Sequence, residues 1–370
     1  MSGIYLHIPF CKSKCAYCNF FSIVSEKQRA DFLEALKREA VMRKDYLGGE
    51  EVKTIYFGGG TPSLLEPLEI LGILGTLDRD YNITAAAAEI TLEANPDTVS
   101  KESLLAYKSI GINRLSIGIQ SFFDDDLQYL SRKHDSKHAL QVLDWAKEAG
   151  FQEITLDLIY GIPTLTDEKW RKNLEIFFST GFNHLSAYAL TVEEKTALGQ
   201  RINKGMAAPV SEDATIRQYE ILCEMTGNQG FEHYEISNFA RPGHYSKHNT
   251  IYWKGEKYLG LGPSAHSFDG VSRQWNVASV KDYCDNYSFE REQLTLDDRY
   301  NEYVMTSLRT CWGCDLDYIR QNFGEKYAEK FKNGIKNHVL AGKMFQKDQK
   351  FILNDHGMLF ADGIAAELFA

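Results

Sequence analysis

The chain has 370 residues, which is enough for one large domain and a smaller one. Its 51 acidic and 41 basic residues give a net charge of −10, which argues against a surface built for nucleic-acid phosphates or anionic lipid. A hydrophobic content of 44% excludes a disordered chain, and no run of about 18 apolar residues is present to cross a membrane.

Six short apolar runs in the first half of the chain predict strands, and amphipathic stretches with helical spacing lie between them. This alternation favours parallel strands joined by right-handed crossovers. Six units are too few for an eight-stranded barrel, so we predict an α/β fold with an open or partial barrel. Functional loops should then follow the carboxyl ends of the strands. The predicted strands are residues 4–8, 54–57, 89–93, 114–119, 153–158 and 184–189.

The pattern changes toward the carboxyl end. Helical spacing at 299–308 and 326–341 is followed by a hairpin pattern at 344–353 and a final helix, which together predict a smaller α+β domain with a wing-like hairpin. We therefore expect a barrel over residues 1–235, with a functional loop at 9–22, a connecting segment over 236–290, and a carboxyl-terminal domain over 291–370.

Seven cysteines, an odd and uneven set, do not form a disulfide framework. The first residues carry neither a basic nor a long apolar segment, so we expect no secretory signal and a reducing, cytoplasmic compartment. Four of the cysteines are interpreted as packing residues. They are Cys223, Cys284, Cys311 and Cys314.

The other three cysteines, Cys11, Cys15 and Cys18, form a CxxxCxxC run directly after the first predicted strand. Three thiolates on a short loop can hold three irons of a [4Fe–4S] cluster, which leaves the fourth iron open to an outside molecule. A zinc site would ordinarily need a second ligand pair, and none follows within about 25 residues. The spacing favours the cluster, with zinc or no metal as alternatives.

A second motif, GGGTP at residues 58–62, directly follows the second predicted strand. Its glycines let a ligand approach the backbone closely. Together with the cysteine run it resembles the radical S-adenosylmethionine (SAM) superfamily, and IYLHIPFC at 4–11 is similar to the branch that contains coproporphyrinogen dehydrogenases and HemW heme chaperones. The likeness continues through EANP (93–96), GIQSF (118–122), RKH (132–134) and DLIYGIP (157–163) and covers essentially the whole chain.

The resemblance implies a partial (β/α)6 barrel in which SAM chelates the open iron through its amino and carboxylate groups. Arg132 suits the SAM carboxylate, Glu93 the amino group, and Gln120 and Asp157 the ribose hydroxyls. Tyr17 would face the adenine. The full set of implied SAM contacts is Tyr5, Tyr17, Gly59, Gly60, Thr61, Glu93, Gln120, Arg132, Asp157 and Ala189.

The branch contains both an enzyme, which decarboxylates coproporphyrinogen III oxidatively, and a chaperone, which passes heme to an acceptor protein. The enzyme has a fourth cysteine where this chain has Phe20. The enzyme also has a segment before its first barrel strand, whereas the first predicted strand of this chain begins at Ile4. HNTIYW at residues 248–253 matches the HNxxYW signature of the chaperones. We therefore predict a heme chaperone, with the dehydrogenase as the alternative.

In the chaperone interpretation, His248 would serve the heme iron, while Tyr252 and Trp253 would pack against the porphyrin. A lone histidine beside a Tyr-Trp pair is more often a core residue, and His244 and His266 are rival ligands. The resemblance also implies an acceptor protein, which the family links to membrane respiratory enzymes.

Overall fold

The computed structural model describes residues 2–84 and 88–370. Six parallel strands pair in chain order, from Ile4 opposite Ile55 to Leu156 opposite Leu185. The predicted partial barrel is confirmed, with every strand within two residues of its expected start. The strands are β1 (Ser2–Ile8), β2 (Val52–Gly59), β3 (Glu89–Ala94), β4 (Arg114–Gln120), β5 (Glu153–Tyr160) and β6 (His184–Ala189).

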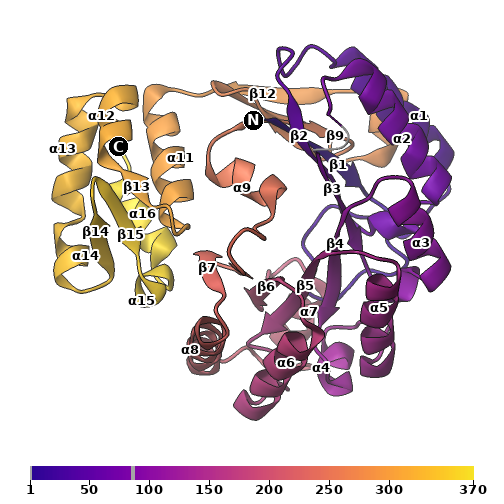
Figure 1. Ribbon diagram of the computed structural model, residues 1–370, viewed down its shortest axis with the longest axis horizontal. Helices are drawn as coiled ribbons and strands as arrows, with labels where there is room; N and C mark the ends of the chain where they lie inside the picture. Colours follow the sequence, from indigo (N-terminus) through magenta and orange to yellow (C-terminus); the bar gives the residue numbers. More distant parts are fainter. Residues whose placement is uncertain (1, 85–87) are drawn as a thin grey trace.

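Helices cover the outer, convex side of this curved sheet, as right-handed crossovers require (Figure 1). Their apolar faces join the strands in one continuous core, which includes Phe32, Ile73 and Trp170. The helices are α1 (Arg29–Met42), η1 (Pro62–Leu64), α2 (Pro67–Asp80), η2 (Pro96–Thr98), α3 (Lys101–Ser109), α4 (Asp124–Tyr129), α5 (Ser136–Glu148) and α6 (Asp167–Thr180).

The sheet extends beyond the six strands on both sides, which the sequence did not indicate. The strand β8 pairs antiparallel with β6, and β9 pairs parallel with β1, with Gly3 opposite Tyr258. The described sheet therefore has twelve strands, in the order β12-β11-β10-β9-β1-β2-β3-β4-β5-β6-β8-β7. The added strands are β7 (Glu232–Glu235), β8 (Asn238–Ala240), β9 (Lys257–Leu261), β10 (His266–Phe268), β11 (Ser272–Asn276) and β12 (Phe289–Gln293).

Four further helices lie along this part of the chain, and one of them occupies the concave side of the sheet. They are α7 (Ala197–Asn203), α8 (Glu212–Asn228), α9 (Lys247–Trp253) and α10 (Val280–Asp285). The helix α9 lies within the curve of the sheet and contacts β1, β2 and β9 (Figure 1). Its contacts reach Gly3 and Thr54, near the starts of β1 and β2, so α9 closes the amino-terminal end of the barrel.

The carboxyl-terminal residues form a second body with its own core, which includes Tyr300, Phe331 and Ile364 (Figure 1). The predicted hairpin is confirmed, and a two-residue strand joins it as a third. The elements are α11 (Leu296–Leu308), β13 (Cys314–Asp315), α12 (Leu316–Phe323), α13 (Glu325–Gly334), α14 (Lys336–Leu340), β14 (Met344–Lys347), β15 (Lys350–Leu353), α15 (Asp355–Met358) and α16 (Ala361–Leu368).

A search of the described residues found no helix with the length and apolarity that a bilayer crossing demands.

Candidate functional site

A cavity of about 480 Å³ opens at the carboxyl ends of the barrel strands, where the topology places a functional site. The cysteine loop forms one wall, and the glycine loop after β2 forms another. The cavity gathers the three cysteines and nine of the ten expected SAM contacts. These lining residues are Cys11, Cys15, Cys18, Tyr17, Gly59, Gly60, Thr61, Glu93, Gln120, Arg132, Asp157 and Ala189.

Backbone hydrogen bonds join the two ends of the cysteine loop to each other and hold its middle against the residues after α4. The Cys11 amide donates to the Ile23 carbonyl at 2.9 Å, and the Ala16 amide donates to Leu130 at 3.3 Å. All three thiols are free. Arg132 Nη1 lies 3.4 Å from the Cys15 sulfur, and the Thr61 hydroxyl lies 3.6 Å from the Cys11 sulfur. Hydrogen bonds of this kind suit sulfurs that carry negative charge, as cluster thiolates do.

Arg132, which lines this cavity, carries a buried donor without a partner in the part of the chain that the structure describes. Its Nη2 donates to the Gly118 carbonyl at 2.7 Å and to Asn95 Oδ1 at 3.0 Å. Its Nε is buried and, among the described residues, has no acceptor. An unpaired guanidinium donor costs free energy unless a ligand supplies the acceptor, and a carboxylate is the group that fits its planar geometry.

The glycine loop leaves no room for side chains. Gly59 has a φ of +110°, which L side chains rarely adopt, and a Cβ on Gly60 would lie 2.7 Å from the Phe10 carbonyl oxygen. The Gly59 amide donates to Glu93 at 3.2 Å. The Gly60 and Thr61 amides donate to the Ile8 and Phe10 carbonyls at 2.8 and 2.7 Å, so the loop packs closely against the start of the cysteine loop.

Two buried carboxyl groups, Glu93 and Asp157, lie in the floor of the cavity. Burial and the nearby Glu93 charge together raise the pKa of Asp157 to about 7, despite hydrogen bonds from Ser116 at 3.2 Å. Burial also raises the pKa of Glu93, although the Tyr56 hydroxyl donates to it at 2.8 Å. Two desolvated acids side by side are costly for folding and are typical of a site that receives a polar or cationic ligand.

Gln120 is aimed by a backbone irregularity. The pairing of β4 with β5 shifts register between Gly118 and Gln120, and Gln120 has a φ of +70°. A bulge at the end of a strand re-aims a side chain at a cost in backbone strain. Here it places Gln120 in the cavity lining beside Gly118 and Arg132.

Tyr5 is the expected SAM contact that does not line the cavity. Its ring stacks on Tyr56 at 6.1 Å, and its hydroxyl is hydrogen-bonded to His7 at 3.0 Å. Tyr56 in turn stacks on His248 at 4.9 Å. The two tyrosines therefore fill the barrel interior between the cavity and α9.

His248 is enclosed at the other end of the barrel. Its Nδ1 is hydrogen-bonded to Thr54 at 2.8 Å and its Nε2 to the Tyr252 hydroxyl at 2.7 Å. The residue is 1% exposed, and burial lowers its pKa to about 3, so the ring is neutral near pH 7. Neutral imidazole is the form that binds metals, yet neither nitrogen is open here.

The two rival histidines differ from His248. His244 Nδ1 is hydrogen-bonded to Glu153 at 2.9 Å, and its Nε2 has no partner in the described part of the chain. His266 is exposed, and its ring centre lies 6.2 Å from that of Trp275, with the ring planes at 29°. Trp253 packs under the Arg309 guanidinium, 5.1 Å from the ring centre, and its buried Nε1 has no acceptor among the described residues.

Comparisons with known proteins show the family of the chain. The Radical SAM superfamily profile matches residues 5–177, and the HemN C-terminal domain profile matches 294–360. The heme chaperone HemW of Bacillus subtilis is 32% identical over 98% of both chains. Its counterpart in Mycobacterium tuberculosis is 33% identical over 99% of this chain and 94% of its own. The chain belongs to the HemW family.

One solved structure shows the same fold over the whole chain. Coproporphyrinogen III oxidase (HemN) from Escherichia coli superposes with a TM-score of 0.86 at 24% identity, covering 100% of this chain and 90% of its own. In this HemW-family chain Phe20 lines the cavity and is 70% exposed.

Sequence reasoning missed several residues of this HemW-family site. Thr54 and Tyr56 alternate along β2 with Gly58 of the glycine motif and share the inward face, so the two-residue period of a strand could have found them. Asn95, which accepts from Arg132, lies within the EANP motif but was not singled out. No local pattern relates Thr54 to His248, because 194 residues separate them.

Proposed function

We propose that the protein is a heme chaperone that binds heme and passes it to an acceptor protein, with a [4Fe–4S] cluster on Cys11, Cys15 and Cys18 and SAM at its open iron. The observation that carries this proposal is the cavity in which three free thiols meet an unpaired buried Arg132 donor. Its support comes from the HemW names of full-length relatives and from the HNxxYW helix at the other barrel end.

The residues of the cavity fit the two groups. A thiolate-bound cluster supplies an electron and one open coordination position. Arg132 would donate to the SAM carboxylate, and carbonyl groups of the glycine loop would accept from its amino-acid end. Asp157 and Gln120 would hold the ribose hydroxyls. Since SAM carries a net positive charge, the two acids Glu93 and Asp157 would also favour its binding electrostatically.

For heme, we propose that His248 contributes once its contact with Tyr252 opens. In the tautomer with the proton on Nδ1, that nitrogen donates to Thr54 and the Nε2 lone pair accepts from Tyr252. Thr54 would then orient the ring, as partners behind a metal ligand do, and Nε2 would become free when the Tyr252 hydroxyl moves. The flat sides of Tyr252 and Trp253 would pack against the porphyrin.

The first test is a heme titration of anaerobically reconstituted protein, with and without SAM. We expect brown protein with iron and sulfide, a Soret band that saturates near one heme per chain, and a change in heme affinity when SAM is present. Cys15→Ala should lose the cluster absorption, whereas Cys284→Ala should keep it. Protein that binds no heme would contradict the chaperone function, and protein without a cluster would contradict the cofactor assignment.

The same preparation tests the dehydrogenase alternative. With SAM, a strong reductant and coproporphyrinogen III, we expect no protoporphyrinogen by chromatography. Appreciable turnover would replace the chaperone proposal with the enzyme.

A pair of variants tests the role of His248. His248→Ala should weaken heme binding at least tenfold, because it removes the ligand. Tyr252→Phe should keep or strengthen binding, because it frees Nε2 from its hydrogen bond while the ring remains. His244→Ala and His266→Ala serve as controls with unchanged Soret spectra. A spectrum altered by either of these, and not by His248→Ala, would move the ligand to that histidine.

A further inference from the structure

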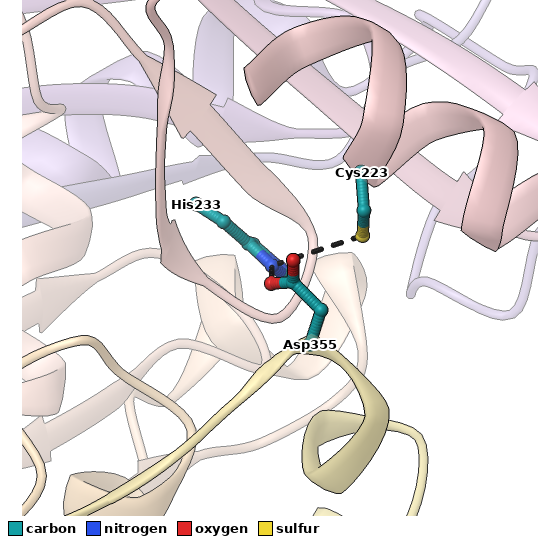
Figure 2. A group of neighbouring side chains, drawn as sticks. All are labelled: Cys223, His233 and Asp355. Atoms are coloured by element: carbon teal, nitrogen blue, oxygen red, sulfur yellow. Dashed lines mark hydrogen bonds and ion pairs between the residues drawn. The ribbon is translucent and has the colours of Figure 1, made fainter. Parts of the chain in front are cut away.

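Three potential metal ligands from separate elements meet where α8 and β7 contact α15 (Figure 2). Cys223 lies on α8, His233 on β7 and Asp355 at the first residue of α15. His233 Nδ1 lies 2.8 Å from Asp355 Oδ1 and 4.0 Å from the Cys223 sulfur. The three ligand atoms all lie within 4.8 Å of one another. A cation between them would need only small side-chain movements.

The imidazole of His233 is oriented as metal-bound histidines usually are. Its Nε2 lies 3.1 Å from the Ile236 carbonyl oxygen, which can only accept, so this nitrogen carries the proton. The ring also stacks on Phe239, with centres 4.2 Å apart and planes at 13°. In the neutral ring the Nδ1 lone pair therefore faces Asp355 and Cys223, and a backbone carbonyl behind the ring fixes this tautomer.

These three groups all offer electron pairs to the same small volume. A carboxylate oxygen and an imidazole lone pair 2.8 Å apart repel each other unless a proton or a cation lies between them. A set of one sulfur, one nitrogen and one oxygen suits a borderline-soft divalent transition ion such as Zn²⁺. Ca²⁺ and Mg²⁺ take oxygen ligands and do not match the set.

We propose that Cys223, His233 and Asp355 form a three-ligand site for a divalent transition metal, with water in the fourth position. The site lies between the two cores, because α8 and β7 belong to the barrel side and α15 follows the carboxyl-terminal hairpin. Tyr219 on α8 donates its hydroxyl to the Asp355 carbonyl at 2.9 Å, which holds that residue in place. A bound ion would therefore tie the carboxyl-terminal body to the barrel.

This site goes beyond the proposed function and shares no residue with the cluster cavity. Cys223 and His233 are ten residues apart, and Asp355 follows 122 residues after His233. No ligand motif has that spacing, which explains why Cys223 was interpreted as a packing thiol. The side chain of Asp355 is 56% exposed, so an ion can enter from solvent.

Cobalt spectroscopy on the full chain tests the site directly. Cys11, Cys15 and Cys18 are replaced by Ala in this chain so that they bind no cobalt. Added Co²⁺ should produce a near-ultraviolet thiolate-to-cobalt band and tetrahedral visible bands that saturate at one equivalent. Cys223→Ser should abolish the charge-transfer band, and Asp355→Asn should weaken Co²⁺ binding at least tenfold. Cys284→Ser, at another half-buried thiol, should leave both unchanged.

A second arm uses the cluster-loaded wild-type chain. Saturating Zn²⁺ should raise its melting temperature by several degrees, since an ion bound only by the folded state stabilises it, and Cys223→Ser should remove this shift. Circular dichroism before metal addition shows that each variant is folded. No cobalt band, or a band that survives Cys223→Ser, would overturn the proposal and leave a simple ion pair between His233 and Asp355. Neither arm reads heme, so failure here is distinct from failure of the chaperone function.

Discussion

The two ends of the barrel differ in how far their buried polar groups are paired. At the carboxyl end, the cavity leaves Arg132 Nε without an acceptor, buries two acids side by side and holds Gln120 at a φ of +70°. At the amino end, both ring nitrogens of His248 are hydrogen-bonded inside a closed aromatic stack. A ligand at the carboxyl end can pair the free donor and relieve the backbone strain. At the amino end every ring nitrogen of His248 already has a partner, so one of these hydrogen bonds must break before His248 can bind a ligand.

The stacked pair Tyr5 and Tyr56 spans the distance between these ends. Tyr56 donates to Glu93 in the cavity floor and packs its ring on His248 beneath. A ligand that changed the charge of Glu93 would therefore act on a ring that contacts the HNxxYW helix. This contact gives a physical reason to titrate heme with and without SAM.

The largest expected effect concerns the carboxyl end of the barrel. Arg132→Lys keeps the charge but removes the planar fork, and we expect SAM affinity to fall roughly 10- to 100-fold, the cost of about 1.5–3 kcal/mol for a lost charged hydrogen bond. Equilibrium binding of SAM to reconstituted protein measures it. Lys133→Ala, the exposed neighbouring cation, is the matched control. Unchanged affinity at equal cluster content would show that the Arg132 donor does not serve SAM.

The second prediction concerns the cost of the buried acids. Because the pKa of Asp157 is about 7 in the folded state and near 4 when unfolded, the folded chain binds more protons between these values, and stability falls as pH rises through 7. Asp157→Asn removes this loss. The free energy of unfolding of Asp157→Asn, relative to that of the wild type, should be roughly 2 kcal/mol larger at pH 8 than at pH 5.

Urea unfolding at the two pH values measures this difference, on chains whose cluster cysteines are replaced by Ala so that unfolding is simple. Asp144→Asn, at an exposed helical acid, should show no such pH dependence. If the stabilities of the two variants depend on pH in the same way, burial of the Asp157 carboxyl group does not destabilise the fold at high pH.

The contrast between the ends also explains what the sequence could predict. The six parallel strands carry apolar side chains at alternate positions, as Leu115, Ile117 and Ile119 do on β4, and this period predicted them at nearly their observed bounds. The added strands were missed because they are short or polar: β8 has three residues, and all five residues of β12 are exposed. The motifs located the cavity residues. The closure of α9 depends on contacts such as Thr54 with His248, which only the folded chain brings together.

The smallest expected effect tests whether the hydrogen bond between Thr54 and His248 at the amino end stabilises the fold. Thr54→Val keeps the shape of the side chain but leaves His248 Nδ1 buried without a partner, so unfolding should become easier by about 1–2 kcal/mol. Thr91 provides a matched control on the next strand, because its buried hydroxyl has no hydrogen-bond partner among the described residues. Thr91→Val should therefore be neutral or stabilising, since it removes a polar group that nothing satisfies. The midpoints of urea unfolding compare the two variants. If Thr54→Val and Thr91→Val change the free energy of unfolding equally, the hydrogen bond from Thr54 to His248 does not stabilise the fold, and the HNxxYW helix is held by packing alone.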